Sequence, residues 1–417
     1  MGSKASDMRT LFPSILARLP VMLWVLWAAS MAISTNRCDA ADKKPLKVFI
    51  LVGQSNMQGH ARISTFAHIG MDPETAPLLG EIQNKDGTPR VCKDVWISYL
   101  STNLVKKGAL TAGFGADDSK IGPELTFGIT MQKHLGEPIL IIKVAWGGKS
   151  LNTDFRPPSA GPYRFNEKQL LGFKKRGKDI ALIKAEKQQA TGRYYRLTIE
   201  HVKSVLANIE QAYPDYDSSQ GYKLAGCVWF QGWNDMVDGG TYPDRGSPGG
   251  YDDYSMVMGH FIRDIRKDLS APKLPFVIGV LGVGGPVEKY GPNQQRYKST
   301  HQNFRLAMAA PAGLPEFKDN VAAVFTENYW DMELDALVAR DAKIKQQVKK
   351  AQSTGKLSGK AAQALREELR NKEFSKRELE ILEKGVSNAA YHYLGSSKIM
   401  ARIGKGFADA MADLQPN

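Results

Sequence analysis

A short apolar run, Val48–Val52, leads directly into the polar sequence Gly53-Gln54-Ser55-Asn56. Continuous Val, Ile, Leu and Phe over this length predict a buried strand of a parallel sheet. Ser55 would then lie at the carboxyl end of that strand, where open α/β sheets hold their reactive groups. The serine is therefore a candidate nucleophile, although an ordinary helix N-cap at a strand-to-helix turn would also carry a serine.

Strand and helix patterns alternate along the rest of the chain. Short runs rich in Val, Ile, Leu and Phe predict five strands, Val48–Val52, Pro138–Val144, Leu224–Phe230, Pro275–Leu281 and Val321–Thr326. Apolar residues at three-to-four spacing predict helices at Ile121–Leu135, Arg196–Tyr213, Tyr251–Leu269, Tyr297–Ala309 and Ile399–Met411. Strands separated by helices imply an α/β fold in which helices cover both faces of a parallel sheet.

The N-terminus has the features of a signal peptide. Three cationic residues precede the apolar run Val21–Ile33, which is too short to span a bilayer comfortably. Small residues near position 40 indicate cleavage after Ala40. We therefore expect a signal peptide at 1–40, a mature domain at 41–417, no stable membrane anchor after cleavage, and a secreted or periplasmic location.

Charge and cysteine content narrow the class of protein further. Cleavage after Ala40 would remove four cationic and two acidic side chains and lower the net charge from +13 to +11. The cationic residues are scattered and not interleaved with aromatic residues, which argues against nucleic-acid binding. Cys92 and Cys227 would remain, and the apolar surroundings of Cys227 favour a buried thiol, although their pairing is left open.

Two segments interrupt the alternation of strands and helices. Residues Pro157–Gly192 are rich in Lys, Gly and Gln and predict a long surface excursion. Residues 334–384 are dominated by Lys, Glu, Arg, Ala and Gln and predict a charged helical insertion. This insertion is either a structural appendage or a lid over a substrate site.

A serine nucleophile needs a base within hydrogen-bond reach, and there are only seven histidines. Six are poorly placed for this role, because they lie inside helical patterns or follow Ser55 too closely: His60, His68, His134, His201, His260 and His301. His392 lies in a loop-like segment before the final helix, where hydrolases often place a base. A buried structural histidine is the alternative interpretation.

Polar residues also follow two other predicted strands. Leu224–Phe230 ends in Gln231-Gly232-Trp233-Asn234-Asp235, and Pro138–Val144 is followed closely by Gly147-Gly148. Glycines let backbone N–H groups approach a ligand, and a side-chain amide can complete an oxyanion hole. Three polar strand ends in one chain favour a catalytic site at the carboxyl edge of the sheet.

Together, these motifs resemble the SGNH hydrolases, specifically the sialate O-acetylesterase and acetylxylan esterase branch. The resemblance rests on the Gly53–Asn56 block, the Gly147-Gly148 pair, the Gln231–Asp235 block and His392, and it spans about residues 46–331 and 386–412. It implies a flavodoxin-like three-layer α/β/α sandwich. It also implies a serine carbohydrate esterase that removes O-acetyl groups from sugars, on sialic acid or a polysaccharide, without a metal or cofactor.

The resemblance also implies roles for individual residues. Ser55 corresponds to the nucleophile and His392 to the base. The backbone N–H groups of Ser55 and Gly148 correspond to oxyanion donors, and Gln231 or Asn234 would supply the side-chain donor.

The chain departs from the family pattern at the catalytic acid. Ala389 occupies the position three residues before the histidine where an Asp is usual, and Trp233 replaces a frequent Glu. Asp235 is the nearest acid to a motif and becomes the first candidate, with Asp331 as the alternative acid. Because an acid mainly orients the imidazole and stabilises its charge, its loss need not abolish activity.

Other functions remain to be weighed against esterase activity. A protein with this fold and a lost acid could bind a glycan with weak or no turnover. The sequence Gly282-Val283-Gly284-Gly285 lacks the glycine spacing of a dinucleotide site, and no cluster has metal-ligand spacing. The identity of the sugar and the oligomeric state are left open.

Overall fold

Seven strands in the described part of the chain form the main sheet: β1 (Leu46–Gly53), β3 (Cys92–Leu100), β4 (Val105–Leu110), β6 (Ile139–Ala145), β7 (Tyr222–Phe230), β8 (Phe276–Val280) and β9 (Val321–Phe325). The computed structural model describes residues 44–102, 104–353 and 357–415, so the predicted signal peptide lies outside the described residues. The strand order is β4-β3-β6-β1-β7-β8-β9, and only β4 runs antiparallel to its neighbour. A separate short ribbon joins β2 (Ala61–Arg62) to β5 (Lys120–Ile121).

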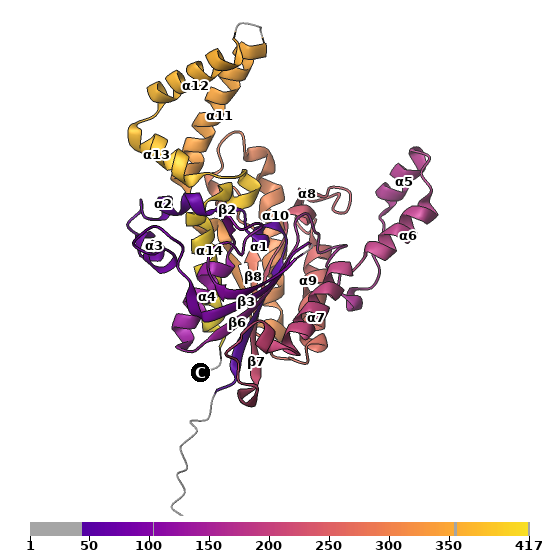
Figure 1. Ribbon diagram of the computed structural model, residues 1–417. Helices are drawn as coiled ribbons and strands as arrows, with labels where there is room; N and C mark the ends of the chain where they lie inside the picture. The colour runs from indigo at the N-terminus through magenta and orange to yellow at the C-terminus, as the bar shows by residue number, and fades with distance from the viewer. Residues whose placement is uncertain (1–43, 103, 354–356, 416–417) are drawn as a thin grey trace, which may run out of the picture. The chain divides into compact units, whose positions relative to one another are not determined.

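The central strands are apolar along their length because both faces of the sheet are covered. Every residue of β6 is buried, and so is all of β1 except Lys47. One face is covered by α4 (Glu124–Leu135) and α14 (Ser397–Asp413), the other by α7 (Arg193–Leu206), α9 (Asp252–Asp268) and α10 (Lys298–Ala309), as Figure 1 shows. The expected α/β/α fold with a parallel sheet is confirmed, apart from the antiparallel edge strand β4.

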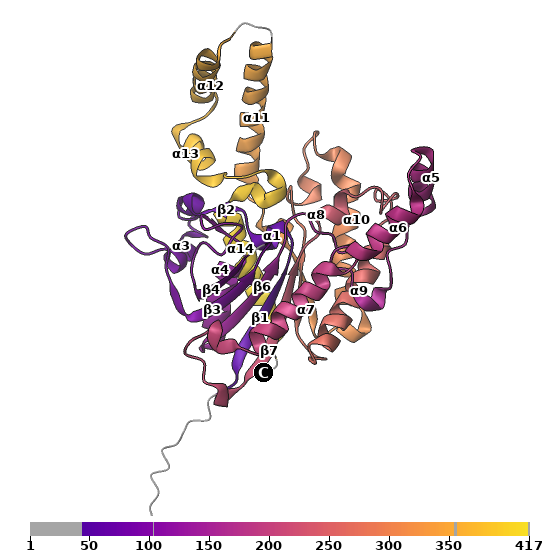
Figure 2. The same ribbon diagram turned by 45° about the vertical axis from the view of Figure 1, so that its right-hand side comes forward.

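The remaining helices lie outside these two layers. Two short helices, α2 (Phe66–Ile69) and α3 (Ala76–Ile82), pack beside α14 and α4, respectively. Two single-turn helices begin at the carboxyl edge of the sheet: α1 (Ser55–Gln58) and α8 (Trp233–Val237). Two excursions are also helical, as Figure 2 shows: α5 (Glu167–Lys175) with α6 (Ile180–Ala190), and α11 (Met332–Ser353) with α12 (Gly359–Glu373) and α13 (Lys376–Gly385). None of the helices in the described ranges is sufficiently long and apolar to cross a bilayer.

The connectivity reverses at the centre of the sheet, the position at which parallel sheets place a ligand-binding crevice. β1 pairs with β6 on one side and with β7 on the other, so the chain crosses over β1 between these two strands. Parallel sheets open a ligand-binding crevice at the carboxyl ends of strands where the direction of winding changes. The segments that follow β1, β6 and β7 therefore begin at this crevice.

The structure also shows what the hydrophobic pattern missed. All five predicted strands are present, but the hairpin of β3 and β4 was not predicted. Cys92 and Cys227 are both free thiols. The excursion at 157–192 contains two helices that the glycine and lysine content did not indicate.

Candidate active site

Ser55 is the first residue of α1 and follows directly from the central strand β1. β1 packs so closely against β7 before this turn that a side chain at Gly53 would collide with the carbonyl oxygen of Phe230, so the position requires glycine. Ser55 is partly exposed, whereas its neighbours Gln54 and Asn56 are buried. The local fold therefore leaves Ser55 accessible at the carboxyl edge of the sheet.

Gln54 ties the serine turn to the other two segments of the crevice. In the orientation that satisfies its surroundings, its amide nitrogen donates to Asn234 Oδ1 (2.9 Å) and to the Lys149 carbonyl (2.8 Å). Its oxygen accepts from the Trp233 N–H (3.1 Å). The hydrogen bonds of this fully buried amide thus hold the segments that follow β1, β6 and β7 in fixed positions relative to one another.

A buried ion pair is hydrogen-bonded to the end of α1. Lys143 Nζ donates to Glu124 Oε2 (2.7 Å), to the Gln58 carbonyl (2.9 Å) and to the Phe114 carbonyl (2.7 Å). Both charged side chains are fully buried, so each needs the other and the surrounding hydrogen bonds. Because Gln58 is the last residue of α1, this pair fixes the end of the serine turn.

The segment after β6 supplies exposed backbone next to Ser55. A Cβ added at Gly147 would lie 3.9 Å from Ser55 Cβ, so this glycine is adjacent to the serine. Gly148 has a φ of 72°, in the left-handed region that favours glycine. In the described ranges, no backbone or side-chain acceptor engages the N–H groups of Ser55 or Gly148. Both groups are available to an oxyanion.

The segment after β7 separates the two candidate side-chain donors. Gln231 is buried, and its amide nitrogen donates to the Lys149 carbonyl (2.9 Å) and to Asp235 Oδ2 (2.5 Å). Asn234 is only half-buried. Gln54 donates to the side-chain oxygen of Asn234, so the side-chain nitrogen of Asn234 is left to donate to a ligand. The geometry therefore favours Asn234 over Gln231 as an oxyanion donor.

His392 lies in a strained turn, Ala390–Gly395, that packs against α1. Tyr393 and Leu394 have φ values of 52° and 61°, which non-glycine residues rarely adopt. The buried Tyr393 hydroxyl accepts from the Gly282 N–H (2.9 Å) and lies 2.6 Å from Thr326 Oγ1, which anchors the turn to the segments after β8 and β9. These hydrogen bonds fix the position of the turn that carries His392.

The group beside the imidazole is an amide rather than a carboxylate. His392 Nδ1 lies 3.1 Å from Asn388 Oδ1, and this oxygen also accepts from the Ala389 N–H (2.7 Å). An amide oxygen can only accept, so Nδ1 carries the proton and Nε2 keeps its lone pair. The sequence placed Ala389 at the usual acid position, and the structure shows Asn388 making the contact instead.

Electrostatics keep this histidine neutral. Burial lowers the pKa of His392 to about 4, with a smaller effect from the positive charge of Lys120. His60 stacks on it with ring centroids 4.0 Å apart, and burial likewise lowers the pKa of His60 to about 4. A neutral imidazole is the form that can accept a proton.

The two candidate catalytic side chains are brought into the same region without a direct hydrogen bond. Ser55 lies on α1 and His392 lies in the turn that packs against α1. No hydrogen bond joins Ser55 Oγ to His392 among the residues described. Catalytic hydrogen bonds are often long before substrate binds.

The structure does not place Asp235 beside His392. Asp235 is 1% exposed, and its carboxylate accepts from the Leu151 N–H (2.8 Å), the Asn152 N–H (3.0 Å), Gln231 and the Tyr242 hydroxyl (3.2 Å). Burial outweighs these hydrogen bonds and raises the pKa of Asp235 to about 6. This carboxylate clamps the segment that follows Gly148.

The alternative acid, Asp331, is also engaged elsewhere. Its Oδ2 pairs with Lys398 Nζ (2.9 Å) and lies 3.7 Å from His68 Nε2. Its Oδ1 accepts from the Leu334 N–H (2.9 Å) at the start of α11. Asp331 thus links the insertion to α14.

Among the described residues, no group of three His, Cys, Asp or Glu side chains could hold a metal ion.

Two aromatic side chains border the site. Trp233 and Tyr391 are partly exposed, and their rings lie 5.6 Å apart. Three further aromatic residues close in sequence to the ends of β6 and β9 or to His392 are buried in the core: Trp146, Trp330 and Tyr393. Of these five aromatic side chains, Trp233 and Tyr391 are the ones accessible to a sugar ring.

Comparisons with known proteins identify the family of the chain. The family described as carbohydrate esterase, sialic acid-specific acetylesterase, matches residues 45–322. A solved structure from Arabidopsis thaliana is 16% identical, with 68% of this chain and 86% of that chain covered and a TM-score of 0.35. A carbohydrate acetylesterase from Xanthomonas citri is 14% identical, with 66% of this chain and 49% of that chain covered and a TM-score of 0.37. No curated protein matches.

The family match covers about two thirds of the chain and contains the serine turn, the glycine pair and the segment after β7. The chain therefore belongs to the carbohydrate esterase family of sialic acid-specific acetylesterases.

Proposed function

We propose that this protein is a serine esterase that removes acetyl groups from carbohydrates through an acyl-enzyme at Ser55. Membership of the family makes the chain a hydrolase of acetyl esters on carbohydrates. The observation that carries the mechanism is the meeting of three features at one sheet edge. These are the partly exposed Ser55, the unengaged N–H groups of Ser55 and Gly148, and the neutral His392 oriented by Asn388.

In the first half of the reaction, Ser55 Oγ attacks the acetyl carbonyl carbon while its proton passes to His392 Nε2. The N–H groups of Ser55 and Gly148 and the amide nitrogen of Asn234 stabilise the negative oxygen that forms. The intermediate collapses when the sugar oxygen leaves with the proton from His392. A water molecule then attacks the acetyl-serine with His392 again as base, which releases acetate and restores Ser55.

Asn388 acts as a positioning residue in this scheme. Its oxygen fixes the tautomer of His392 in which Nε2 is free to accept a proton. It adds no negative charge beside the imidazole, so it stabilises the imidazolium less than a carboxylate would. Amide partners of catalytic histidines are chemically sufficient, since cysteine proteases of the papain type use one.

The direct test is a comparison of Ser55→Ala with Ser64→Ala, an exposed serine nearby. We expect Ser55→Ala to lower kcat for acetate release by about 10⁴-fold or more and Ser64→Ala to leave it unchanged. A serine-directed phosphonate should label Ser55 in the wild-type protein. Labelling at another residue would contradict the mechanism, and a wild-type protein that binds acetylated glycans without releasing acetate would favour the glycan-binding alternative.

The substrate and the site of action extend the proposal. Acetate release from acetylated xylan, from O-acetylated sialic acids and from other acetylated glycans would identify the preferred sugar.

We also propose export, because the charged start, the apolar run and the small residues near Ala40 occur in signal-peptide order. N-terminal sequencing of secreted or periplasmic material should find a chain that begins near Ala41, and an intact Met1 would contradict it.

A further inference from the structure

The excursion that contains α5 and α6 concentrates positive charge. We call residues 163–190 the α5–α6 arm. It carries eight Lys and Arg residues against three Asp and Glu residues, a net charge of +5 in a mature chain of +11. Neither helix of the arm buries a single residue. The arm therefore exposes nearly half of the excess positive charge on a short projecting segment (Figure 2).

These cationic groups are not neutralised by the protein itself. Within the described ranges, no ion pair joins any Lys or Arg of the arm to a carboxylate. Only two of them contact aromatic rings, Arg176 over Phe173 (5.5 Å) and Lys187 over Tyr163 (4.4 Å). Unpaired cations on an exposed segment attract polyanions.

The arm also contains a pocket of about 650 Å³, within the ~300–1,000 Å³ typical of small-molecule sites. Its lining combines two cations, two aromatic rings and an amide: Arg164, Lys184, Tyr163, Phe165 and Gln188, with Leu170 and Ala185 completing the wall. Cations bind carboxylates, aromatic faces stack on sugar rings, and amides bond to hydroxyls. Arginine in particular matches the planar geometry of a carboxylate.

The base of the arm is bonded to chain that continues from the segments after β6 and β7. Asn166 Nδ2 donates to the Gly240 carbonyl (2.8 Å), and the Tyr163 hydroxyl lies 3.0 Å from Thr241 Oγ1, beyond the segment after β7. At the other end, Lys187 Nζ donates to Thr153 Oγ1 (3.2 Å), in the segment after β6. A polymer held on the arm would therefore run toward the crevice.

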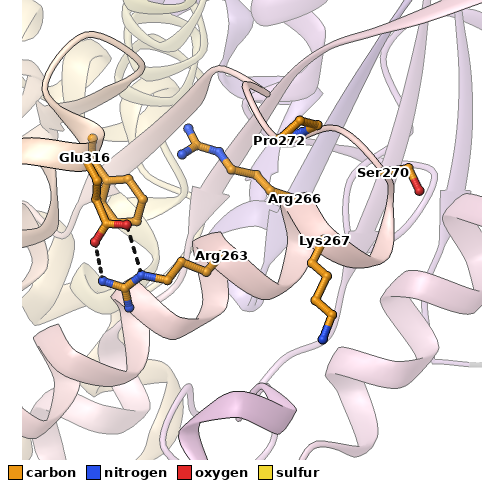
Figure 3. A pocket seen from close by; sticks show the side chains of 7 residues that line it. Arg263, Arg266, Lys267, Ser270, Pro272 and Glu316 are labelled. Carbon is orange, nitrogen blue, oxygen red and sulfur yellow. Dashed lines mark hydrogen bonds and ion pairs between the residues drawn. The ribbon is translucent and has the colours of Figure 1, made fainter.

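Another cationic pocket of the molecule lacks these properties. It lies at the amino-terminal edge of the sheet, away from Ser55, and Figure 3 shows Glu316 paired with Arg263 there. Arg266 in the same pocket donates to the Leu274 carbonyl (2.8 Å) and to Asn320. Its two arginines are already satisfied by the protein, whereas Arg164 and Lys184 are not.

We propose that the α5–α6 arm is a docking surface for a carboxylated polysaccharide, with one acidic sugar unit held by Arg164 and Lys184. The inference builds on the proposed esterase function, because the docked polymer would be the carrier of the acetyl ester. Docking raises the local concentration of esters near Ser55 without taking part in the chemistry. It should therefore lower KM for an acidic polymer and leave the turnover of small esters unchanged.

The test compares Arg164→Gln/Lys184→Gln with a matched control, Lys343→Gln/Lys349→Gln, which removes two exposed charges from α11. Binding of the full mature protein to polygalacturonate, dextran sulfate and neutral dextran is measured at two salt concentrations. We expect the first variant to bind polygalacturonate about tenfold more weakly and the control to bind like the wild type. KM for acetylated polygalacturonate should rise in proportion, with kcat and hydrolysis of 4-nitrophenyl acetate unchanged.

Equal binding of polygalacturonate by the two variants and the wild type would overturn the proposal. Equal weakening of binding in both variants would also overturn it, because binding would then respond to net charge alone. Tighter binding of dextran sulfate than of polygalacturonate would overturn the carboxylate assignment. Preferential binding of anionic lipid vesicles or duplex DNA would assign the arm to another partner. Binding is also measured in Ser55→Ala, so a failure of the esterase mechanism is distinguished from a failure of docking.

Discussion

Two segments at the carboxyl edge of the sheet hold their polar groups in opposite ways. After β7, the Asp235 carboxylate is buried among four hydrogen-bond donors, none of them a histidine. Before α14, an uncharged amide of Asn388 contacts the half-buried ring of His392. The acid thus stabilises a loop, and a neutral group orients the imidazole. Proximity to a motif in sequence is a poor guide to which carboxyl group serves a base.

This difference has an electrostatic consequence. A carboxylate beside an imidazole favours the charged ring and raises its pKa. The amide of Asn388 exerts no such effect, and burial lowers the pKa of His392 to about 4. The structure therefore holds His392, the proposed base, neutral over a wide pH range. In the proposed reaction its imidazolium would be stabilised less than by a carboxylate.

The largest effect should come from removing the imidazole. His392→Ala should lower kcat/KM for acetyl ester hydrolysis by about 10³–10⁴-fold, because Ser55 loses the base that the proposed mechanism assigns to it. His134→Ala is the matched control, since His134 is an exposed histidine in the last turn of α4. Full activity of purified His392→Ala, with an unchanged melting temperature, would remove His392 from the mechanism.

Removing the amide tests the second half of the comparison. Asn388→Ala should lower kcat by about 10–100-fold, because the ring loses the acceptor that fixes its tautomer and orientation. KM should change little, since the proposed role of Asn388 is to orient His392 and not to bind the sugar. Steady-state kinetics on a soluble acetyl ester measure both constants. A larger loss in Asp235→Asn than in Asn388→Ala would reverse the assignment.

Asp235 should act on stability more than on turnover. Asp235→Asn leaves an N–H group facing donors and should lower the free energy of unfolding by about 1–3 kcal/mol, while activity of the folded protein falls less than about tenfold. Asp238→Asn, an exposed carboxylate of the same segment, is the control. Denaturant unfolding at pH 7 measures the difference.

The sign of the pH dependence sharpens this test. The folded pKa of Asp235 is raised to about 6 from 3.8, so the proton-linked part of its contribution to stability is complete below pH 4 and is lost as pH rises through 6. The hydrogen bonds that its carboxylate accepts persist at pH 7. Unfolding of Asp235→Asn should lack this slope between pH 4 and 6. An identical slope in wild type and variant would show that Asp235 is not the titrating group.

The fold was largely predictable from sequence because its central elements follow simple patterns. Strands β1 and β6 are buried on both faces and therefore read as continuous apolar runs. The edge hairpin of β3 and β4 was missed because edge strands are partly exposed and carry Lys and Asp between apolar residues. Patterns of hydrophobicity identify the centre of a sheet better than its edge.

The site was predictable only where its residues follow strands directly. Ser55, Gly148 and Asn234 come within a few positions of strand ends, so the parallel sheet brings them together. The partner of His392 could not be derived, because the strained turn at Tyr393 and Leu394 decides which side chain faces Nδ1. The buried pair of Lys143 and Glu124 was also missed. A lysine inside the apolar strand Ile139–Ala145 was the signal that could have revealed it.

The smallest expected effect, a shift of the acid limb, separates the two segments most directly. Because His392 must be neutral to act as a base, kcat/KM should fall as pH decreases through its pKa. With that pKa lowered to about 4, activity should stay level from pH 7 to about pH 5, whereas an unperturbed histidine would lose half its activity near 6.5.

Asn388→Asp should move the acid limb toward higher pH, because a carboxylate at the position of the amide oxygen, 3.1 Å from Nδ1, favours the charged ring. The measurement is kcat/KM for an uncharged acetyl ester between pH 3.5 and 8, with activity rechecked at pH 7 to exclude unfolding. Asp235 titrates near 6 and could imitate a limb there. Asp235→Asn resolves this ambiguity, since a limb that survives that substitution and moves with Asn388→Asp belongs to His392. A limb that disappears in Asp235→Asn would assign the pH dependence to the loop after β7 instead.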